Sequence, residues 1–157
     1  MRVYIAGPIS NGENNSMGYQ AVVDNIRNAI LIGGRVADMG CSPMVPHLTH
    51  FWNLMDPRPY QDWLRIDDEW VLVSDVVLRI SGNSAGADRE VALALSHGIP
   101  VVYTLEDLHA LYKSWQEGYA GPFTGAGSRK DRQQGRPQLL PDGARVQPSE
   151  TGRVCGS

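Results

Sequence analysis

The chain has 157 residues, of which 42% are hydrophobic and 20% are charged, and its formal net charge is −3. This length and composition are typical of one globular domain with its own core and exclude a disordered or fibrous chain. The small negative charge gives no reason to expect binding to nucleic acids. No apolar stretch is long enough to span a bilayer, and the N-terminus lacks the features of a secretory signal.

The two ends of the chain differ in charge and composition. Residues 1–117 hold 14 acidic and 8 basic side chains, whereas residues 118–157 hold 3 and 6. The second stretch is rich in Gly, Pro, Gln, Ser and Arg and has little periodic apolar content, so we predict a folded domain over 1–117 and an irregular tail over 118–157. Cys41 and Cys155 do not have the spacing of a disulfide framework, and we expect two reduced thiols in a cytoplasmic protein.

The N-terminal half begins with a short apolar run over 2–7, which predicts a buried strand, followed by a polar loop. Apolar residues then recur at helical spacing over 19–39, and Gly40 stands where a left-handed helix end is expected. Gly33 and Gly34 lie inside this helix at a cost of roughly 1 kcal/mol each relative to Ala. Their presence indicates close packing on that face.

A second short strand is predicted over 42–48, followed by a loop over 49–59 with exposed aromatic residues. The next helix, over 59–74, carries Trp63 and Trp70 on a stripe expected to be buried. The remaining elements alternate in the same way: a strand over 75–80, a helix over 86–98, a strand over 100–105 and a helix over 106–116.

This alternation predicts an α/β fold with a doubly wound, flavodoxin-like or Rossmann-like sheet of four to five mainly parallel strands and helices on both faces. In such sheets, ligands bind at the carboxyl ends of the strands. The loops that follow the first three strands, 7–18, 47–58 and 81–86, should therefore meet at one edge.

The third of these loops leads into the segment SGNSAGADRE at 81–90. A helix that starts here presents unpaired N–H groups and partial positive charge, which together favour an anion. Gly86 leaves the approach open, and Ser84 adds a hydroxyl. Glu90 lies one turn deeper, so a ligand could meet both the anion site and a carboxylate. The alternative is a simple Ser cap and a surface Glu.

A second carboxylate, Asp67, borders the buried stripe of the preceding helix, whereas Asp68 and Glu69 are expected to face water. A carboxylate beside a buried stripe needs a partner or a chemical role. Two carboxylates that flank a sugar are the groups that cleave glycosidic bonds.

Taken in order, these segments resemble the nucleoside 2-deoxyribosyltransferase superfamily over most of residues 1–104. The resemblance rests on VYIAGPIS at the first strand, on Asp67 ahead of SDVVL, and on GADRE leading into VALALSHGIPVV. It implies a doubly wound α/β domain that is usually dimeric or larger. It also implies that Glu90 is the nucleophile, Asp67 the second carboxylate and Tyr4 the aromatic residue on the first strand.

Within the superfamily, a serine at position 84 resembles the branch that hydrolyses nucleoside 5′-monophosphates, because the base-exchanging transferases often carry an acid there. The expected phosphate site consists of Ser84 and Gly86, with Ser10 and Asn11 of the first loop, and Gly7 is a further expected substrate-binding residue. The implied reaction cleaves the N-glycosidic bond. Two alternatives are a 2-deoxyribosyltransferase and a nucleotide-binding module without turnover. A homodimer is expected, with no bound nucleic acid polymer.

The segment PHLTHFW places His47, His50 and Trp52 after the second strand. The two histidines are three residues apart, which would allow a metal pair, but no third ligand lies beside them, and we predict no metal or cofactor. We expect His47 and Trp52 to form a polar or stacking wall for the nucleobase. Plain loop packing is the alternative.

Overall fold

A computed structural model of the chain describes residues 1–9 and 18–118. Ser10, Asn11, Cys155 and the predicted tail over 119–157 lie outside the described residues, and the domain boundary stays a prediction. The described strands are β1 (Arg2–Ala6), β2 (Ser42–Met44), β3 (Val76–Arg79) and β4 (Val101–Val102). The described helices are α1 (Tyr19–Asp38), a 3₁₀ helix (Pro46–Leu48), α2 (Thr49–Met55), α3 (Tyr60–Val73), α4 (Ala85–Ser96) and α5 (Leu105–Gln116).

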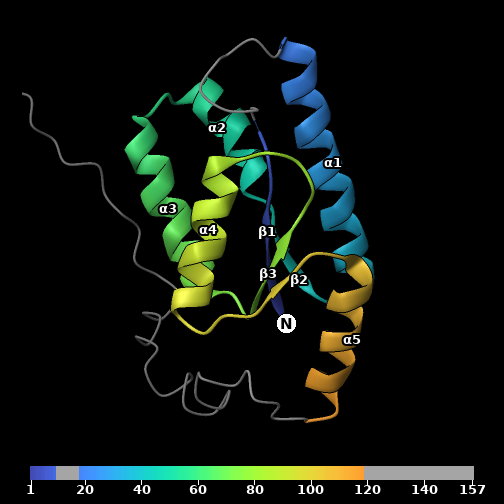
Figure 1. Cartoon of the computed structure of the whole chain (residues 1–157). Helices are drawn as coiled ribbons and strands as arrows, with labels where there is room; N and C mark the ends of the chain where they lie inside the picture. The colour runs from blue at the N-terminus through green and yellow to red at the C-terminus, as the bar shows by residue number, and fades with distance from the viewer. Residues whose placement is uncertain (10–17, 119–157) are drawn as a thin grey trace, which may run out of the picture. The chain divides into compact units, whose positions relative to one another are not determined.

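The four strands form one parallel sheet in the order β2-β1-β3-β4, with β1 and β3 at its centre. In the register, Val3 lies opposite Pro43 on one side and Val76 on the other. Helices α1 and α5 cover one face of the sheet, and α3 and α4 cover the other (Figure 1). The predicted doubly wound α/β fold is therefore confirmed, with four strands.

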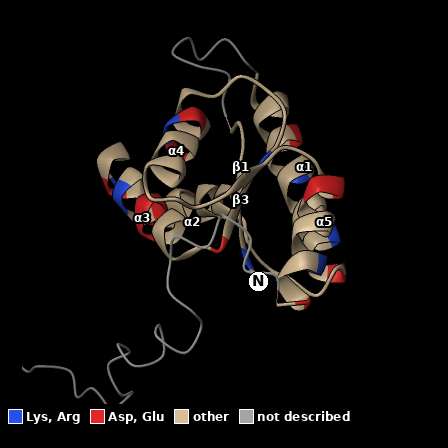
Figure 2. Ribbon diagram, turned by 60° about the horizontal axis from the view of Figure 1, so that its bottom comes forward, with Lys and Arg blue, Asp and Glu red and all other residues tan. Residues whose placement is uncertain are grey.

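Each face of the sheet has its own apolar core, because successive side chains of β1 point to opposite faces. Val3 and Ile5 pack with α1 and α5, whereas Tyr4 and Ala6 pack with α3 and α4. All four side chains are buried, which explains the continuous apolar run in the sequence. Charged residues lie mainly on the helices (Figure 2), and none of the described helices is long and apolar enough to cross a membrane.

The end of α1 and one of its two glycines behave as predicted. Gly40 has a φ of +84°, the left-handed conformation expected at a helix end. A Cβ on Gly33 would lie 2.7 Å from Cγ2 of Val45, so close packing requires glycine there. A Cβ on Gly34, in contrast, would meet no atom within 4 Å.

The stretch after β2 differs from the prediction in two ways. The strand ends at Met44, because Pro46 starts a 3₁₀ helix. The expected loop then contains a helix, α2, which continues that turn through a hydrogen bond of 2.7 Å from the Thr49 hydroxyl to the carbonyl of Pro46. The apolar side chains of α2, such as Phe51 and Trp52, are about half exposed. Without a buried stripe, the sequence pattern gave no helical periodicity.

Strand β4 is also shorter than predicted, since it covers only Val101–Val102. The chain leaves the sheet early because the side chain of Thr104 already caps α5. Its hydroxyl oxygen accepts a hydrogen bond of 3.0 Å from the amide of Asp107.

Of the two tryptophans expected in the buried stripe of α3, one is buried and the other is not. Trp63 is buried, and its indole N–H donates to Oδ1 of Asn53 over 2.9 Å. Trp70 is 46% exposed and faces outward above β2. The physical reason is that α3 packs against α4, and no other described helix or strand covers the side of α3 that carries Trp70.

Candidate active site

The start of α4 is built by Ser84, which caps the helix. The oxygen of its hydroxyl accepts a hydrogen bond of 3.2 Å from the amide of Ala87. The amides of Ala85 and Gly86 precede the first intrahelical bond, which runs from the Asp88 amide to the Ser84 carbonyl. The Ser cap, which was the alternative to an anion site, is therefore present, and the hydroxyl of Ser84 can still donate its own proton.

Gly86 borders open space at this helix start. A Cβ at this position would lie 3.8 Å from the Ser84 Oγ and 3.9 Å from the Tyr60 hydroxyl, which are ordinary contacts. Tyr60 is largely exposed and begins α3, so α3 contributes a second hydroxyl beside the start of α4. Tyr60 was not among the predicted site residues. The sequence signal that could have indicated it is the position of Tyr60 directly after Pro59, at the start of a predicted helix.

The carboxylate of Glu90 lies inside the protein, not on the surface. Its side chain is 9% exposed, and the hydroxyl of Tyr4 donates to its Oε1 over 2.9 Å. Tyr4 is fully buried at the centre of the sheet, on β1. This bond joins α4 to the central strand and fixes the orientation of the carboxylate, so the alternative of a surface Glu is wrong.

The protonation of Glu90 is set mainly by burial. Burial raises the pKa of Glu90 to about 8, against the lowering effect of the Tyr4 hydrogen bond, and the charge of Asp67 raises it further. The pKa of the Tyr4 hydroxyl is raised by burial and by the charges of Glu90 and Asp67, so this hydroxyl stays neutral and acts as a donor.

Asp67 on α3 is the second carboxyl group of the site, and it is partly buried. Its Oδ1 is buried and has no hydrogen-bond partner among the described residues. Burial, and then the charge of Asp68, raise the pKa of Asp67 to about 7, while Arg89 opposes the shift. The charge of Asp67 also raises the pKa of Glu90, so the two carboxyl groups lie close enough to interact.

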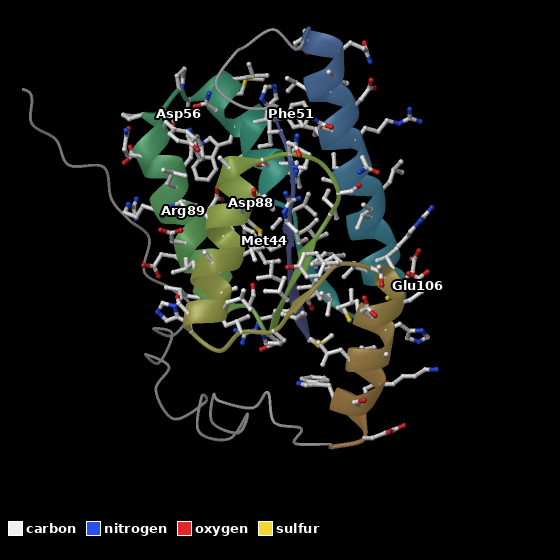
Figure 3. All side chains as sticks on the ribbon, viewed as in Figure 1. Met44, Phe51, Asp56, Asp88, Arg89 and Glu106 are labelled. Atoms are coloured by element: carbon white, nitrogen blue, oxygen red, sulfur yellow. The ribbon has the colours of Figure 1, made fainter. Side chains whose placement is uncertain are left out.

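A salt bridge between Asp68 and Arg89 joins α3 to α4 beside this pair. Arg89 is labelled on α4 in Figure 3. Nη1 of Arg89 donates to Oδ1 of Asp68 over 2.8 Å. The expectation that Asp68 faces water is therefore wrong, because the side chain of Arg89 partly buries Asp68. Glu69 is exposed, as expected. The positive charge of Arg89 lowers the pKa of both Asp67 and Glu90, although burial outweighs it.

Arg79 holds the loop between β3 and α4 in place. Its side chain is 10% exposed and donates to the carbonyl of Ile80, to the carbonyl of Gly82 over 2.8 Å, and to Oδ1 of Asp88 over 2.9 Å. Gly82 has a φ of +117°, and a Cβ on it would lie 2.8 Å from Cγ of Pro8. Arg79 is thus an ion-paired residue that positions the start of α4.

We expect Arg79→Met to destabilise the protein by about 1–3 kcal/mol, because it leaves loop carbonyls without their donor. The substitution should be compared in urea unfolding with Arg65→Met, which removes an exposed arginine from α3. Arg79→Lys should restore only part of the loss, because an ammonium group lacks the planar fork of the guanidinium. Equal stability of Arg79→Met and Arg65→Met would contradict the role of Arg79.

His47 lies in the 3₁₀ helix that follows β2 and is 1% exposed. Neither ring nitrogen has a hydrogen-bond partner among the described residues. Burial lowers the pKa of His47 to about 4, and the backbone of Pro8 and Gly7 opposes only part of this shift. A Cβ on Gly7 would lie 2.4 Å from Cγ1 of Ile80 and 3.3 Å from Nε2 of His47, so glycine lets this neutral imidazole approach β1.

Trp52 is not brought to the carboxyl pair. It is half exposed, its ring lies 5.3 Å from that of Trp63, and the guanidinium of Arg58 lies 5.7 Å from its ring centroid. It lines an apolar groove whose lining does not include Glu90 or Asp67. Across residues 1–9 and 18–118, no group of three or more His, Cys, Asp or Glu side chains is arranged to hold a metal ion.

The structure therefore brings together Tyr4, Asp67 and Glu90. It places Gly86 one turn before Glu90 on α4 and Ser84 at the cap of that helix. No protein-family model, curated protein or solved structure matches the chain.

Proposed function

We propose that the protein hydrolyses the N-glycosidic bond of a nucleoside 5′-monophosphate and releases the free base and the sugar 5-phosphate. The observation that carries this proposal is the carboxyl pair, in which Tyr4 orients the buried Glu90, and the partly buried Asp67 keeps an oxygen without a hydrogen-bond partner among the described residues. Perturbed carboxyl groups of this kind are typical of catalytic sites, and glycosidic bonds are cleaved by two carboxyls. The resemblance of the sequence supports the same reaction.

The proposed reaction starts from the form of the pair that holds one proton, with that proton on Asp67 and not on Glu90. A carboxylate oxygen of Glu90 then forms a bond to the anomeric carbon of the sugar. The bond from that carbon to the base nitrogen breaks, and its electron pair leaves with the base, which takes the proton held by Asp67. Water then attacks the same carbon, gives a proton to Asp67 and releases Glu90. The steps balance without a cofactor.

The phosphate of the substrate is assigned to the start of α4. The amides of Ala85 and Gly86, the hydroxyl of Ser84 and the positive end of the helix all favour an anion there. The nearby carboxylate of Asp88 is paired with Arg79, so its repulsion of a phosphate is reduced. Glu90 lies one helical turn after Gly86, and this distance suits a sugar placed between the phosphate and the carboxylate.

We expect Ser84→Asp to lower kcat/KM for the monophosphate by about 10–100-fold more than for the nucleoside, because a new negative charge repels the dianion. Ser84→Asn is the matched control, since Asn and Asp cap helices equally well but Asn is neutral. Equal losses for the monophosphate and the nucleoside would argue against a phosphate at this position.

The experiment that tests the proposed function is incubation with ribo- and deoxyribonucleoside monophosphates, including modified pyrimidines, scored by chromatography for free base. Release of base from at least one monophosphate supports the proposal. Addition of a second free base separates hydrolysis from the alternative of 2-deoxyribosyl transfer, which would give a new nucleoside. Tight binding without release of base would favour the nucleotide-binding module.

We also propose that the protein acts in the cytoplasm as a homodimer. The reduced state expected of the thiols is compatible with Cys41, which is a buried free cysteine. The homodimer follows from the resemblance of the sequence.

A further inference from the structure

The salt bridge between Arg89 and Asp68 joins the two helices that carry the carboxyl pair. Arg89 directly precedes Glu90 on α4, and Asp68 directly follows Asp67 on α3. Nη1 of Arg89 donates to Oδ1 of Asp68 over 2.8 Å, and Nη2 donates to Oδ2. Of the ion pairs formed by the described residues, this is the one that joins two helices.

The two carboxyl groups are anchored unequally. The hydroxyl of Tyr4 holds Glu90 against the central strand through a hydrogen bond of 2.9 Å. Oδ1 of Asp67 is buried and has no hydrogen-bond partner among the described residues. The position of Asp67 relative to Glu90 therefore depends on where α3 lies.

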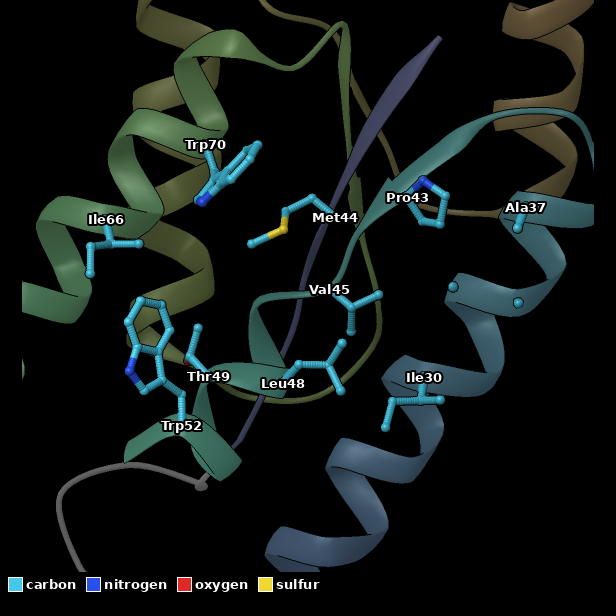
Figure 4. A pocket seen from close by; sticks show the side chains of 12 residues that line it. Ile30, Ala37, Pro43, Met44, Val45, Leu48, Thr49, Trp52, Ile66 and Trp70 are labelled. Carbon is cyan, nitrogen blue, oxygen red and sulfur yellow. The ribbon is translucent and has the colours of Figure 1, made fainter. Parts of the chain in front are cut away.

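Helix α3 is held mainly from the side of α4. Its other side carries Ile66 and Trp70, which line the open apolar groove (Figure 4). Near its start, α3 is also tied to α2 by the hydrogen bond from Trp63 to Asn53. At the level of the carboxyl pair, the salt bridge is the hydrogen-bonded contact that the described residues form between α3 and α4.

A salt bridge in this position affects geometry more than stability. The side chains of Arg89 and Asp68 are 44% and 27% exposed, and pairs in contact with water add little to the free energy of unfolding. Their two parallel bonds, in contrast, fix the distance and the orientation of the groups they join. Because neighbouring residues of a helix are only about 1.5 Å apart along its axis, a shift of α3 at Asp68 also moves Asp67.

We propose that Arg89 and Asp68 are positioning residues, and that their salt bridge sets the separation of Glu90 and Asp67. The proposed hydrolysis needs both carboxyl groups within reach of one glycosidic bond. A misplacement of about 1 Å can cost on the order of 10²-fold in rate. The effect on rate rests on the proposed hydrolysis, whereas the separation of the carboxyl groups can be tested without substrate.

Steady-state release of base tests the effect on rate. Asp68→Asn should lower kcat by about 10–100-fold and leave KM nearly unchanged, because the salt bridge positions Asp67 and does not bind the substrate. Arg89→Lys should show most of this loss, since an ammonium group keeps the charge but lacks the planar fork. Glu69→Gln and Arg65→Lys change exposed residues of α3 and are the matched controls, which should keep the full kcat.

Carbon-13 NMR of the side-chain carboxyl groups tests their separation without substrate. The groups that face Glu90 are Tyr4 of β1, Asp67 and Asp68 of α3, and Arg89 of α4. Asp67→Asn alone should lower the pKa of Glu90, because the charge of Asp67 raises it. In a protein that also carries Asp68→Asn and Arg89→Met, Asp67→Asn should lower this pKa by less, since the carboxyl groups are no longer held close.

The two measurements separate the role of the salt bridge from the proposed hydrolysis. A protein that releases no base from any monophosphate would overturn the hydrolysis, and the NMR result would still decide whether the salt bridge sets the separation. An equal change in the pKa of Glu90 with and without the salt bridge would overturn the proposal. Full kcat in Arg89→Lys, the mildest of these changes, would do the same, because charge alone would then be sufficient.

Discussion

Replacement of Glu90 by Gln is expected to lower the rate of base release by a factor on the order of 10³ or more. The amide keeps the shape of the side chain and can still accept the hydrogen bond from Tyr4, but it cannot form the bond to the anomeric carbon. Steady-state release of base, measured with the best monophosphate, checks this result. Glu106→Gln, on α5, is a matched control that should keep full activity.

The same substitution should make the protein more stable in alkaline solution. The pKa of Glu90 is raised by burial to about 8 in the folded state, above the ordinary value of 4.5. The contribution of Glu90 to the free energy of unfolding is therefore fully present below about pH 4.5. This contribution, a few kcal/mol at most, is lost as the pH rises toward 8. The Glu90→Gln variant should not show this loss of stability at high pH, because Gln does not ionise. Unfolding experiments at pH 5 and pH 9 would contradict the burial of Glu90 if both proteins showed the same pH dependence.

The second large effect is expected from Asp67. We expect kcat/KM to have a bell-shaped pH dependence with limbs near the pKa values of about 7 and 8 that the pair shares, because the reaction needs one carboxylate and one proton. Asp67→Asn should lower kcat/KM by about 10²–10⁴-fold and remove the limb due to the acid. It should also lower the pKa of Glu90, since the charge of Asp67 raises it.

Glu69→Gln is the control for Asp67→Asn, because Glu69 is the exposed carboxylate two residues away on the same helix. The Glu69→Gln variant should keep the kcat/KM of the unaltered protein and its bell-shaped pH dependence. An Asp67→Asn variant with an unchanged pH profile would contradict the assignment of Asp67 as the proton donor.

The fold class followed from the sequence because buried parallel strands and the helices between them have strong local patterns. β1 is a continuous apolar run, and α1 ends at a glycine with positive φ. Helix α2 was missed because its apolar side chains are not buried by the rest of the described chain, so it lacks the periodicity of a packed helix. The exposure of Trp70 depends on which neighbour α3 packs against, which the sequence does not reveal.

The carboxyl pair could be predicted as a set of residues, but its geometry could not. Tyr4 and Glu90 are 86 residues apart, and their hydrogen bond exists only because α4 packs on the centre of the sheet. The position of Tyr60 beside Gly86 and the bonds from Arg79 to the loop carbonyls likewise depend on tertiary packing. Trp52 was assigned to the site from its place after β2, but the helix that contains it directs it to the groove.

The most direct test of the central claim is mass spectrometry of the protein after acid quenching during turnover. The account predicts that the unaltered protein gains the mass of a sugar 5-phosphate on the peptide that contains Glu90, and that Glu90→Gln gains none. Turnover with no modification of that peptide, or with the sugar attached to another residue, would contradict it.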